Sequence, residues 1–234
     1  MPTYARIHQL SLSLIYHIYS RSNDRIPIFK SKEDFIYFMG LLKKYSLRFG
    51  LKIYHWVIMS NHYHLLLELD EPKRISRIMA GLSKAYSCYH HKTYFTAGFL
   101  WQGRFKLQPV QKDNYLIACG RYIERNPVRA GIVNKVYGYP YSSASYYCSG
   151  ENDGITVEDP AFLTFGTNLT SRRNAYIEFL RRFDSEEEKS FNNFEQPVGN
   201  KGFLRRLIKE NGRFTSRRRG RPRKELLHNS LLAI

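Results

Sequence analysis

Residues 51–69 contain two apolar runs separated by Ser60 and Asn61, and this pattern constrains the fold more than any other stretch of the chain. Serine and asparagine favour turns, because their short polar side chains form hydrogen bonds with nearby backbone groups. The two runs therefore predict a β-hairpin, with strands over residues 51–59 and 62–69.

The second strand of this hairpin carries two histidines, His62 and His64. Successive side chains in a strand point to opposite faces, so both imidazoles share one face and Tyr63 points to the other. Two imidazoles about 7 Å apart along one strand can bind a single metal ion or phosphate. An isolated H-x-H pair in a tyrosine-rich chain can also be incidental. A third ligand and a nucleophile elsewhere in the chain would favour a site.

Apolar periodicity predicts further elements on both sides of the hairpin. They are a strand over residues 12–23, helices over residues 32–49, 74–94 and 113–126, and a strand over residues 104–110. The first half of the chain thus follows the order strand, helix, strand, strand.

The helix predicted over residues 113–126 carries Tyr115 and Tyr122, seven residues apart and hence nearly on one face. Tyr122 and Asn126 are four residues apart, so a hydroxyl and an amide oxygen can project from adjacent turns toward one point. The alternative is that both tyrosines are core residues and that Asn126 only ends the helix before Pro127.

The formal net charge of +17 indicates an anionic partner, with nucleic acid as the leading candidate. Charge alone does not separate DNA from RNA or from an anionic membrane. The apolar patch near the N-terminus is too short and too polar for a membrane-spanning helix, so we expect no membrane partner. Three cysteines without C-x-x-C spacing predict free thiols in a reducing compartment, and we expect a cytoplasmic protein.

Two segments of the first 150 residues carry cations that can contact the phosphates of a nucleic acid. Arg77 and Lys84 lie on the polar face of the helix predicted over residues 74–94, and Trp101 and Arg104 lie in the loop that follows. Such residues grip nucleic acid in some proteins, but in others they are a solvated helix face and a packed aromatic ring.

The composition changes beyond Gly150. We expect a helical extension and an acidic linker over residues 151–195, and a basic DNA-binding tail over residues 196–234. From residue 201 to residue 225, eleven Lys or Arg residues stand against two Glu residues. The sequence RGRPRK resembles an AT-hook, which lies in the narrow minor groove of A·T-rich DNA. Its predicted phosphate and groove contacts come from Arg217, Arg219, Arg221 and Arg223.

Three motifs occur in a characteristic order: YHIYSRSN at residues 16–23, MSNHYHLLLE at residues 59–68 and RYIERNPVRAG at residues 121–131. This order resembles the single-tyrosine HUH transposases, and within them the REP-associated tyrosine transposases. The resemblance spans residues 8–148, and residues 1–150 are expected to form the HUH domain. Ser22 departs from the glycine that is usual in the first motif of these proteins.

The resemblance implies an α+β fold, in which a ferredoxin-like antiparallel sheet packs on helices, followed by a basic helical or flexible C-terminal extension. His62 and His64 match the metal-binding pair, Asn126 matches the polar side chain that completes metal binding, and Tyr122 matches the nucleophile. Tyr122 is preferred to Tyr115, because Asn126 follows it at the right spacing. The metal is Mg²⁺ or Mn²⁺ in this family.

The function implied is a metal-dependent transposase that nicks and rejoins single-stranded DNA near hairpins through a 5′-phosphotyrosine intermediate. Two alternatives stay open: a DNA-binding regulator that keeps the fold but does not cleave, and a metal-dependent phosphodiesterase that uses activated water. The sequence leaves open whether one subunit builds the site or two subunits of a homodimer share it.

Overall fold

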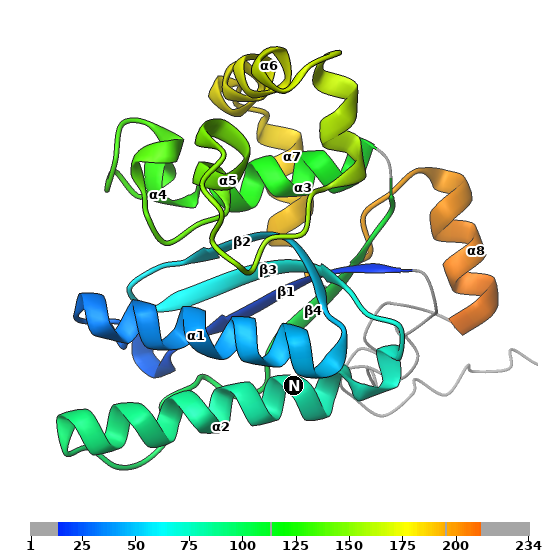
Figure 1. Cartoon of the computed structure of the whole chain (residues 1–234). Coiled ribbons are helices and arrows are strands. Elements are labelled where there is room, and N and C mark those ends of the chain that lie inside the picture. The colour runs from blue at the N-terminus through cyan, green and yellow to red at the C-terminus, as the bar shows by residue number, and fades with distance from the viewer. Residues whose placement is uncertain (1–13, 113, 195, 212–234) are drawn as a thin grey trace, which may run out of the picture.

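A four-stranded antiparallel sheet with helices on both faces forms the centre of the molecule (Figure 1). The computed structural model describes residues 14–112, 114–194 and 196–211. The strands are β1 (Ile15–Arg21), β2 (Lys52–Ile58), β3 (His62–Glu68) and β4 (Lys106–Val110), and they lie in the order β2-β3-β1-β4. This arrangement confirms the predicted α+β, ferredoxin-like fold, with the histidine-bearing strand β3 inside the sheet.

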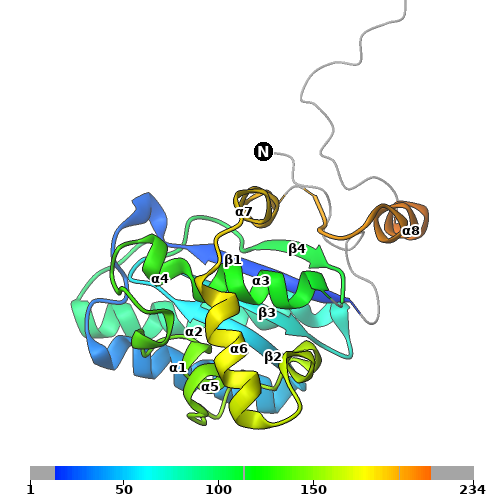
Figure 2. The same ribbon diagram turned by 90° about the horizontal axis from the view of Figure 1, so that it is seen from above.

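The helices form two layers, one on each face of the sheet. The helices are α1 (Lys32–Phe49), α2 (Ile75–Tyr94), α3 (Asn114–Glu124), α4 (Asn126–Arg129), α5 (Ala144–Ser149), α6 (Leu169–Arg181), α7 (Ser185–Asn192) and α8 (Lys201–Asn211). Helices α1 and α2 cover one face, whereas α3 to α7 lie on the other (Figure 1). Seen from above, α3 lies across the strands and α7 lies beside it (Figure 2).

The first long helix, α1, has the bounds that the periodicity predicts. The Asp34 carboxylate accepts hydrogen bonds from the backbone N–H groups of Lys30 and Ser31, which ties down the first turn. Gly50 ends the helix in the left-handed conformation at φ 64°. Asp113, the first residue of the helix predicted over residues 113–126, lies outside the described residues.

Side-chain alternation along β3 divides the core into two parts. Tyr63, Leu65 and Leu67 belong to the large cluster that also contains the buried faces of α1 and α2. Leu66 points the other way and packs with Tyr122 and Ile123 of α3 in a second cluster. The side of β3 that carries His62 and His64 is therefore the side covered by α3.

The chain beyond residue 181 differs from the sequence prediction, because the segment predicted as an acidic linker contains helix α7. Asp184 caps this helix by accepting hydrogen bonds from the backbone N–H groups of Glu186 and Glu187. Acidic residues in a first turn also interact favourably with the helix dipole. Phe191 is fully buried against the α3 side of the sheet, so the helix is anchored there.

Ser22 lies in the first of the three motifs, at a position where glycine is usual, and its backbone conformation does not require glycine. Its backbone is extended, at φ −63° and ψ 155°, and its hydroxyl donates a hydrogen bond of 2.6 Å to the carbonyl of Ile26.

None of the helices in the described parts of the chain is both long enough and apolar enough to cross a membrane.

Candidate active site

His62 and His64 point toward the α3 side of the sheet, as strand alternation predicts. Their ring centroids lie 5.3 Å apart. Tyr63, between them, points to the opposite face, where its ring lies against Phe38 and Trp101. One face of β3 thus presents two imidazoles, while the other is a packed aromatic core.

Tyr122 approaches these histidines from α3. Its ring stands edge-on to the His64 ring, with 5.7 Å between the centroids. Tyr115, the other tyrosine of α3, is partly buried at the edge of the same core cluster. Among the ring contacts of the described residues, none joins Tyr115 to either histidine. The structure therefore brings Tyr122, not Tyr115, to the histidine pair.

Asn126 lies at the start of α4, immediately after α3 ends, and its side chain is held in one orientation. Its Nδ2 atom donates hydrogen bonds of 3.0 Å to the carbonyls of Tyr122 and Ile123. With both amide hydrogens directed back at the helix, the oxygen Oδ1 faces the site. The Asn126 side chain also lies close enough to His62 to influence the pKa of that imidazole. Asn126 therefore begins a new helix directly after α3, and its side chain belongs to the site.

Both imidazoles are neutral at physiological pH, which is the form that binds metal ions. Burial, together with the nearby charge of Arg129, lowers the pKa of His62 to about 4. Burial and the neighbouring imidazoles of His17 and His62 hold the pKa of His64 well below its usual value. Burial also raises the pKa of the Tyr122 phenol, and the guanidinium of Arg129 opposes part of that rise.

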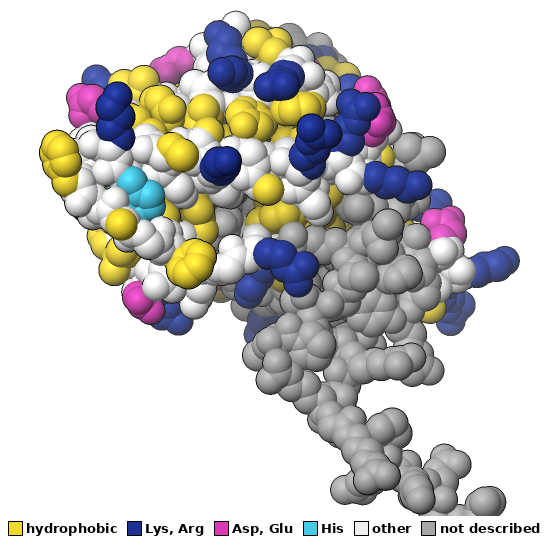
Figure 3. All heavy atoms as spheres, turned by 90° about the horizontal axis from the view of Figure 1, so that it is seen from below, with side chains coloured by type: hydrophobic (Ala, Val, Ile, Leu, Met, Phe, Trp, Pro, Cys, Tyr) yellow, Lys and Arg dark blue, Asp and Glu magenta, His cyan; other side chains and the backbone are white. Residues whose placement is uncertain are grey.

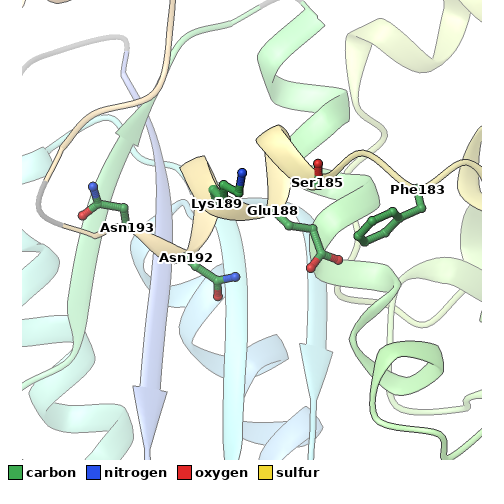
Figure 4. Close-up of a pocket in the computed structure, with 6 residues that line it drawn as sticks. All are labelled: Phe183, Ser185, Glu188, Lys189, Asn192 and Asn193. Carbon is green, nitrogen blue, oxygen red and sulfur yellow. The ribbon is translucent and has the colours of Figure 1, made fainter.

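Helix α7 covers the candidate nucleophile. Only 4% of Tyr122 is exposed, and its hydroxyl donates a hydrogen bond of 2.7 Å to Oδ1 of Asn192 at the end of α7. The ring of Phe191 lies 5.6 Å from the Tyr122 ring. Figure 4 shows the hollow beside α7, with Asn192 and Glu188 projecting from one side of the helix and Lys189 from another. A substrate must displace the Asn192 side chain to reach the hydroxyl.

Arg129 connects the parts of the site, although the sequence analysis did not single it out. Its guanidinium lies 4.9 Å from the centre of the Tyr122 ring and donates a hydrogen bond of 2.6 Å to Oδ1 of Asn126. It also forms an ion pair of 3.3 Å with Glu188 of α7. The Arg129 side chain is 35% exposed, so an anion from solvent can reach it. Arg129 lies in the RNPVRAG motif, one helical turn after Asn126, and this position in the sequence could have indicated a role at the site.

The donor atoms at the site fit a divalent metal ion. Two neutral imidazoles from β3 and the amide oxygen of Asn126 face the same region. The described residues contain no group of three or more His, Cys, Asp or Glu side chains that could hold a metal ion. The predicted site therefore depends on the amide oxygen as its third donor. Imidazole nitrogen is softer than the oxygen ligands that Mg²⁺ prefers, so this set favours Mn²⁺ over Mg²⁺.

Two of the predicted DNA-binding residues lie on the other side of the sheet from this cluster. Arg77 and Lys84 are exposed on α2, on the opposite face of the sheet, and Figure 3 shows Lys and Arg side chains spread over that side of the molecule. Trp101 is partly buried, and its indole N–H donates a hydrogen bond of 3.1 Å to the carbonyl of Ser83. Arg104 is exposed in the loop before β4. The tail residues Arg217, Arg219, Arg221 and Arg223 lie outside the described residues.

A buried ionic network anchors the helix that carries Tyr122, and the sequence analysis missed it. His55 of β2 lies 2.8 Å from the carboxylate of Glu124 in α3 and 3.1 Å from that of Asp159, with all three side chains inaccessible to solvent. Burial alone lowers the pKa of His55, but the two carboxylates outweigh it and raise that pKa to about 9. Glu124 also accepts hydrogen bonds from Ser143 and Tyr176. The network joins α3 to segments far along the chain.

Comparisons with known proteins agree with this architecture. Residues 11–126 match the family model described as "Transposase IS200 like". A solved structure, described as "Structure of the REP associates tyrosine transposase bound to a REP hairpin", is similar with a TM-score of 0.52 and 20% sequence identity. The similarity covers 61% of this chain and 82% of that one, and it shows the shared fold. No curated protein sequence matches the chain. Through residues 11–126, which contain both histidines, Tyr122 and Asn126, the chain belongs to the IS200-like transposase family.

Proposed function

We propose that this protein nicks and rejoins single-stranded DNA near hairpins, with Tyr122 as the nucleophile and a divalent metal ion held by His62, His64 and Asn126. The observation that carries the proposal is the convergence of these four side chains from β3, α3 and α4 on one side of the sheet. The family to which the chain belongs and the DNA-bound state of its structural relative support a DNA substrate.

The proposed reaction is a transesterification at one phosphodiester. The Tyr122 oxygen attacks phosphorus, the new O–P bond forms, and the bond from phosphorus to the 3′ oxygen breaks. The phenol loses its proton and the departing 3′ oxygen gains one, so the products are a 5′-phosphotyrosine and a free 3′-hydroxyl. When bound, the metal ion polarises the scissile phosphate and neutralises charge that develops there. Attack by a 3′-hydroxyl on the phosphotyrosine reverses the reaction and rejoins a strand.

The surroundings of Tyr122 support a role for Arg129 in the same reaction. A phenol with a raised pKa needs nearby positive charge to react as an oxyanion. Arg129 supplies that charge directly over the Tyr122 ring. Arg129 forms an ion pair with the carboxylate of Glu188. Because guanidinium binds carboxylate and phosphate groups in similar geometry, a phosphate oxygen would take the place of this carboxylate during the proposed reaction.

DNA outside the site is proposed to contact the cations of the α2 face and the basic tail. Arg77 and Lys84 would bind the backbone of a hairpin, and Arg104 a flanking strand. The four tail arginines would add affinity that falls as salt rises. The packing of Trp101 argues for a structural role for that ring, and the proposal does not need it to stack on bases.

The coverage of Tyr122 by α7 favours a second candidate function, that of a DNA-binding regulator which does not cleave. The nucleophile is nearly inaccessible, and its hydroxyl is already hydrogen-bonded to Asn192. A protein that never displaced α7 would bind DNA and leave it intact.

One experiment distinguishes these functions from hydrolysis by activated water. A library of hairpin oligonucleotides with randomised single-stranded flanks is incubated with the full chain and either Mn²⁺ or Mg²⁺, and covalent protein–DNA adducts are isolated and sequenced. We expect the sequenced adducts to contain the 3′ fragment of the cleaved oligonucleotide. We also expect no adduct after chelation by EDTA and more adduct with Mn²⁺ than with Mg²⁺. Cleavage without an adduct indicates the water mechanism, and binding without cleavage indicates the regulator.

The variants Tyr122→Phe and Tyr115→Phe form a matched pair on the same helix. Each change removes one hydroxyl and keeps the ring, so packing is preserved. We expect the Tyr122 variant to lose adduct formation and the Tyr115 variant to keep it. The opposite pattern would assign the nucleophile to Tyr115.

A further inference from the structure

We propose that His17 and Gln108 are positioning residues that fix the tautomer of His64, so that its Nε2 atom carries the lone pair and faces the metal. This inference rests on the proposed function for the role of the metal, but the tautomer itself is a property of the protein without metal or DNA. Both positioning residues are fully buried, as is His64 at 2% exposure. A chain of polar contacts from Gln108 through His17 to His64 determines where each hydrogen atom lies.

The first link is the orientation of the Gln108 amide, on β4. Its Nε2 atom lies 3.0 Å from the carbonyl oxygen of Ser190, 2.7 Å from that of Asn193 and 2.9 Å from that of Gln196. Carbonyl oxygens only accept hydrogen bonds, so the NH₂ group must face them. The reverse orientation would place the amide oxygen against three other oxygens in a buried position. The Oε1 atom of Gln108 therefore faces His17.

The second link is the His17 ring, on the neighbouring strand β1, whose hydrogen position follows from the orientation of Gln108. Gln108 Oε1 lies 3.3 Å from His17 Nδ1, and an amide oxygen only accepts, so Nδ1 carries the hydrogen. A neutral imidazole carries one hydrogen, and His17 is buried without a carboxylate partner in any contact described for it. Its Nε2 atom is therefore an acceptor.

The third link fixes His64. His17 Nε2 lies 2.8 Å from His64 Nδ1, so the hydrogen between them belongs to His64 Nδ1. The other nitrogen, Nε2, then holds the lone pair that a metal ion needs. Free imidazole exchanges between both tautomers in water, whereas this chain allows one. A hydrogen bond to the second ring nitrogen is the usual way in which proteins orient a metal-binding histidine.

The chain of contacts links the metal site to a segment beyond the family match. The three carbonyls that orient Gln108 belong to the end of α7 and the residues after it, whereas His17, His64 and Gln108 lie within residues 11–126. The C-terminal extension thus determines which nitrogen of His64 is available.

The test observes the tautomer directly. Protein labelled with ¹⁵N in its histidines is studied by NMR without metal, because the two nitrogen shifts of each ring report which atom carries the hydrogen; His64→Gln identifies the resonances. We expect His64 to be protonated at Nδ1 in the unaltered protein. His17→Phe keeps a flat ring but removes the acceptor, so we expect the Nε2-protonated form to appear, and His17→Gln to restore Nδ1 protonation in part. His90→Phe, at a buried histidine of α2, is the control that leaves His64 unchanged.

A second arm measures binding of Mn²⁺ alone by calorimetry. Loss of such a supporting contact typically lowers metal affinity about 10- to 100-fold, and we expect His17→Phe to fall in that range and His90→Phe not to. His64 protonated at Nε2 in the unaltered protein would overturn the inference whatever the protein does to DNA. The expected tautomer with no Mn²⁺ affinity would refute the metal role. Mn²⁺ binding that depends on His17, in a protein that forms no DNA adduct, supports the inference and refutes the proposed strand transfer.

Discussion

The hydroxyl of Tyr122 donates a hydrogen bond of 2.7 Å to Oδ1 of Asn192, a residue outside the segment that matches the transposase family. The candidate nucleophile must break this bond before it attacks a phosphate. A hydrogen bond of this kind contributes about 0.5–1.5 kcal/mol net, which corresponds to a factor of about 2 to 12 in rate.

Asn192→Ala should therefore raise the initial rate of adduct formation by about two- to twelvefold, measured in single-turnover assays with an oligonucleotide captured from the library. Lys189→Ala is the matched control, because Lys189 lies on another side of α7 and is largely exposed. An equal effect of both changes would mean that general loosening of α7, and not this hydrogen bond, limits the rate.

Arg129→Ala should lower the rate of adduct formation by about 10²- to 10³-fold while DNA affinity changes little, because the guanidinium is proposed to act on the reacting phosphate. Filter binding in the Tyr122→Phe background measures the affinity separately from the reaction. Glu188→Gln breaks the same ion pair but keeps the guanidinium, so its rate should not fall. A matching fall in that variant would show that the ion pair, and not the free cation, is what activity needs.

Gly120→Ala should destabilise the protein by about 1–3 kcal/mol in urea unfolding. A Cβ atom at residue 120 would lie 2.6 Å from Nε2 of His55, so α3 can approach β2 this closely only at a glycine. Gly40 of α1 is the control, because a Cβ atom there meets nothing within 4 Å. Gly40→Ala should stabilise the protein by up to about 1 kcal/mol through helix propensity. Similar effects at both positions would contradict the close contact at His55.

The free energy of unfolding should fall as the pH rises from about 6.5 to 9, because of His55. Its pKa is raised to about 9 in the folded protein, so between these values the folded state binds a proton that the unfolded state has released. The associated stability is present below pH 6.5 and lost as the pH passes 9. Urea unfolding at pH 7 and pH 9 measures the difference, which His55→Gln should reduce. An unchanged difference in that variant would assign the pH dependence to another group.

Local sequence patterns predicted the elements that build the site. The strand alternation at His62 and His64 and the periodicity of α1 each depend on neighbours a few residues apart, and the structure confirms both. The helix predicted to end near Asn126 ends at Glu124, and Asn126 begins α4 with Pro127 in its first turn. The fold class followed from the resemblance of three short motifs to a known family. The assignment of Tyr122 as nucleophile and of three metal ligands stays a prediction.

The contacts that complete the site were not predictable in this way. His17 meets His64 only through the pairing of β1 with β3, and Gln108 meets His17 only through the pairing of β1 with β4. Asn192 reaches Tyr122 only because α7 folds back on α3. Each pairing joins residues dozens of positions apart, and no spacing rule in one sequence specifies the partner. The acidic composition around α7 indicated a linker, since Asp184 and the glutamates that start the helix are also typical of solvated chain.

The buried ionic network has a consequence for how the chain can be divided. A protein shortened to residues 11–126 keeps His55 and Glu124 but lacks Asp159 and the groups that share the Glu124 carboxylate. It would leave a charged pair half-enclosed in an apolar interior, which costs several kcal/mol. We expect such a fragment to be unfolded or molten, although it contains His62, His64, Tyr122 and Asn126. The segment that matches the family is thus shorter than the segment that we expect to fold cooperatively.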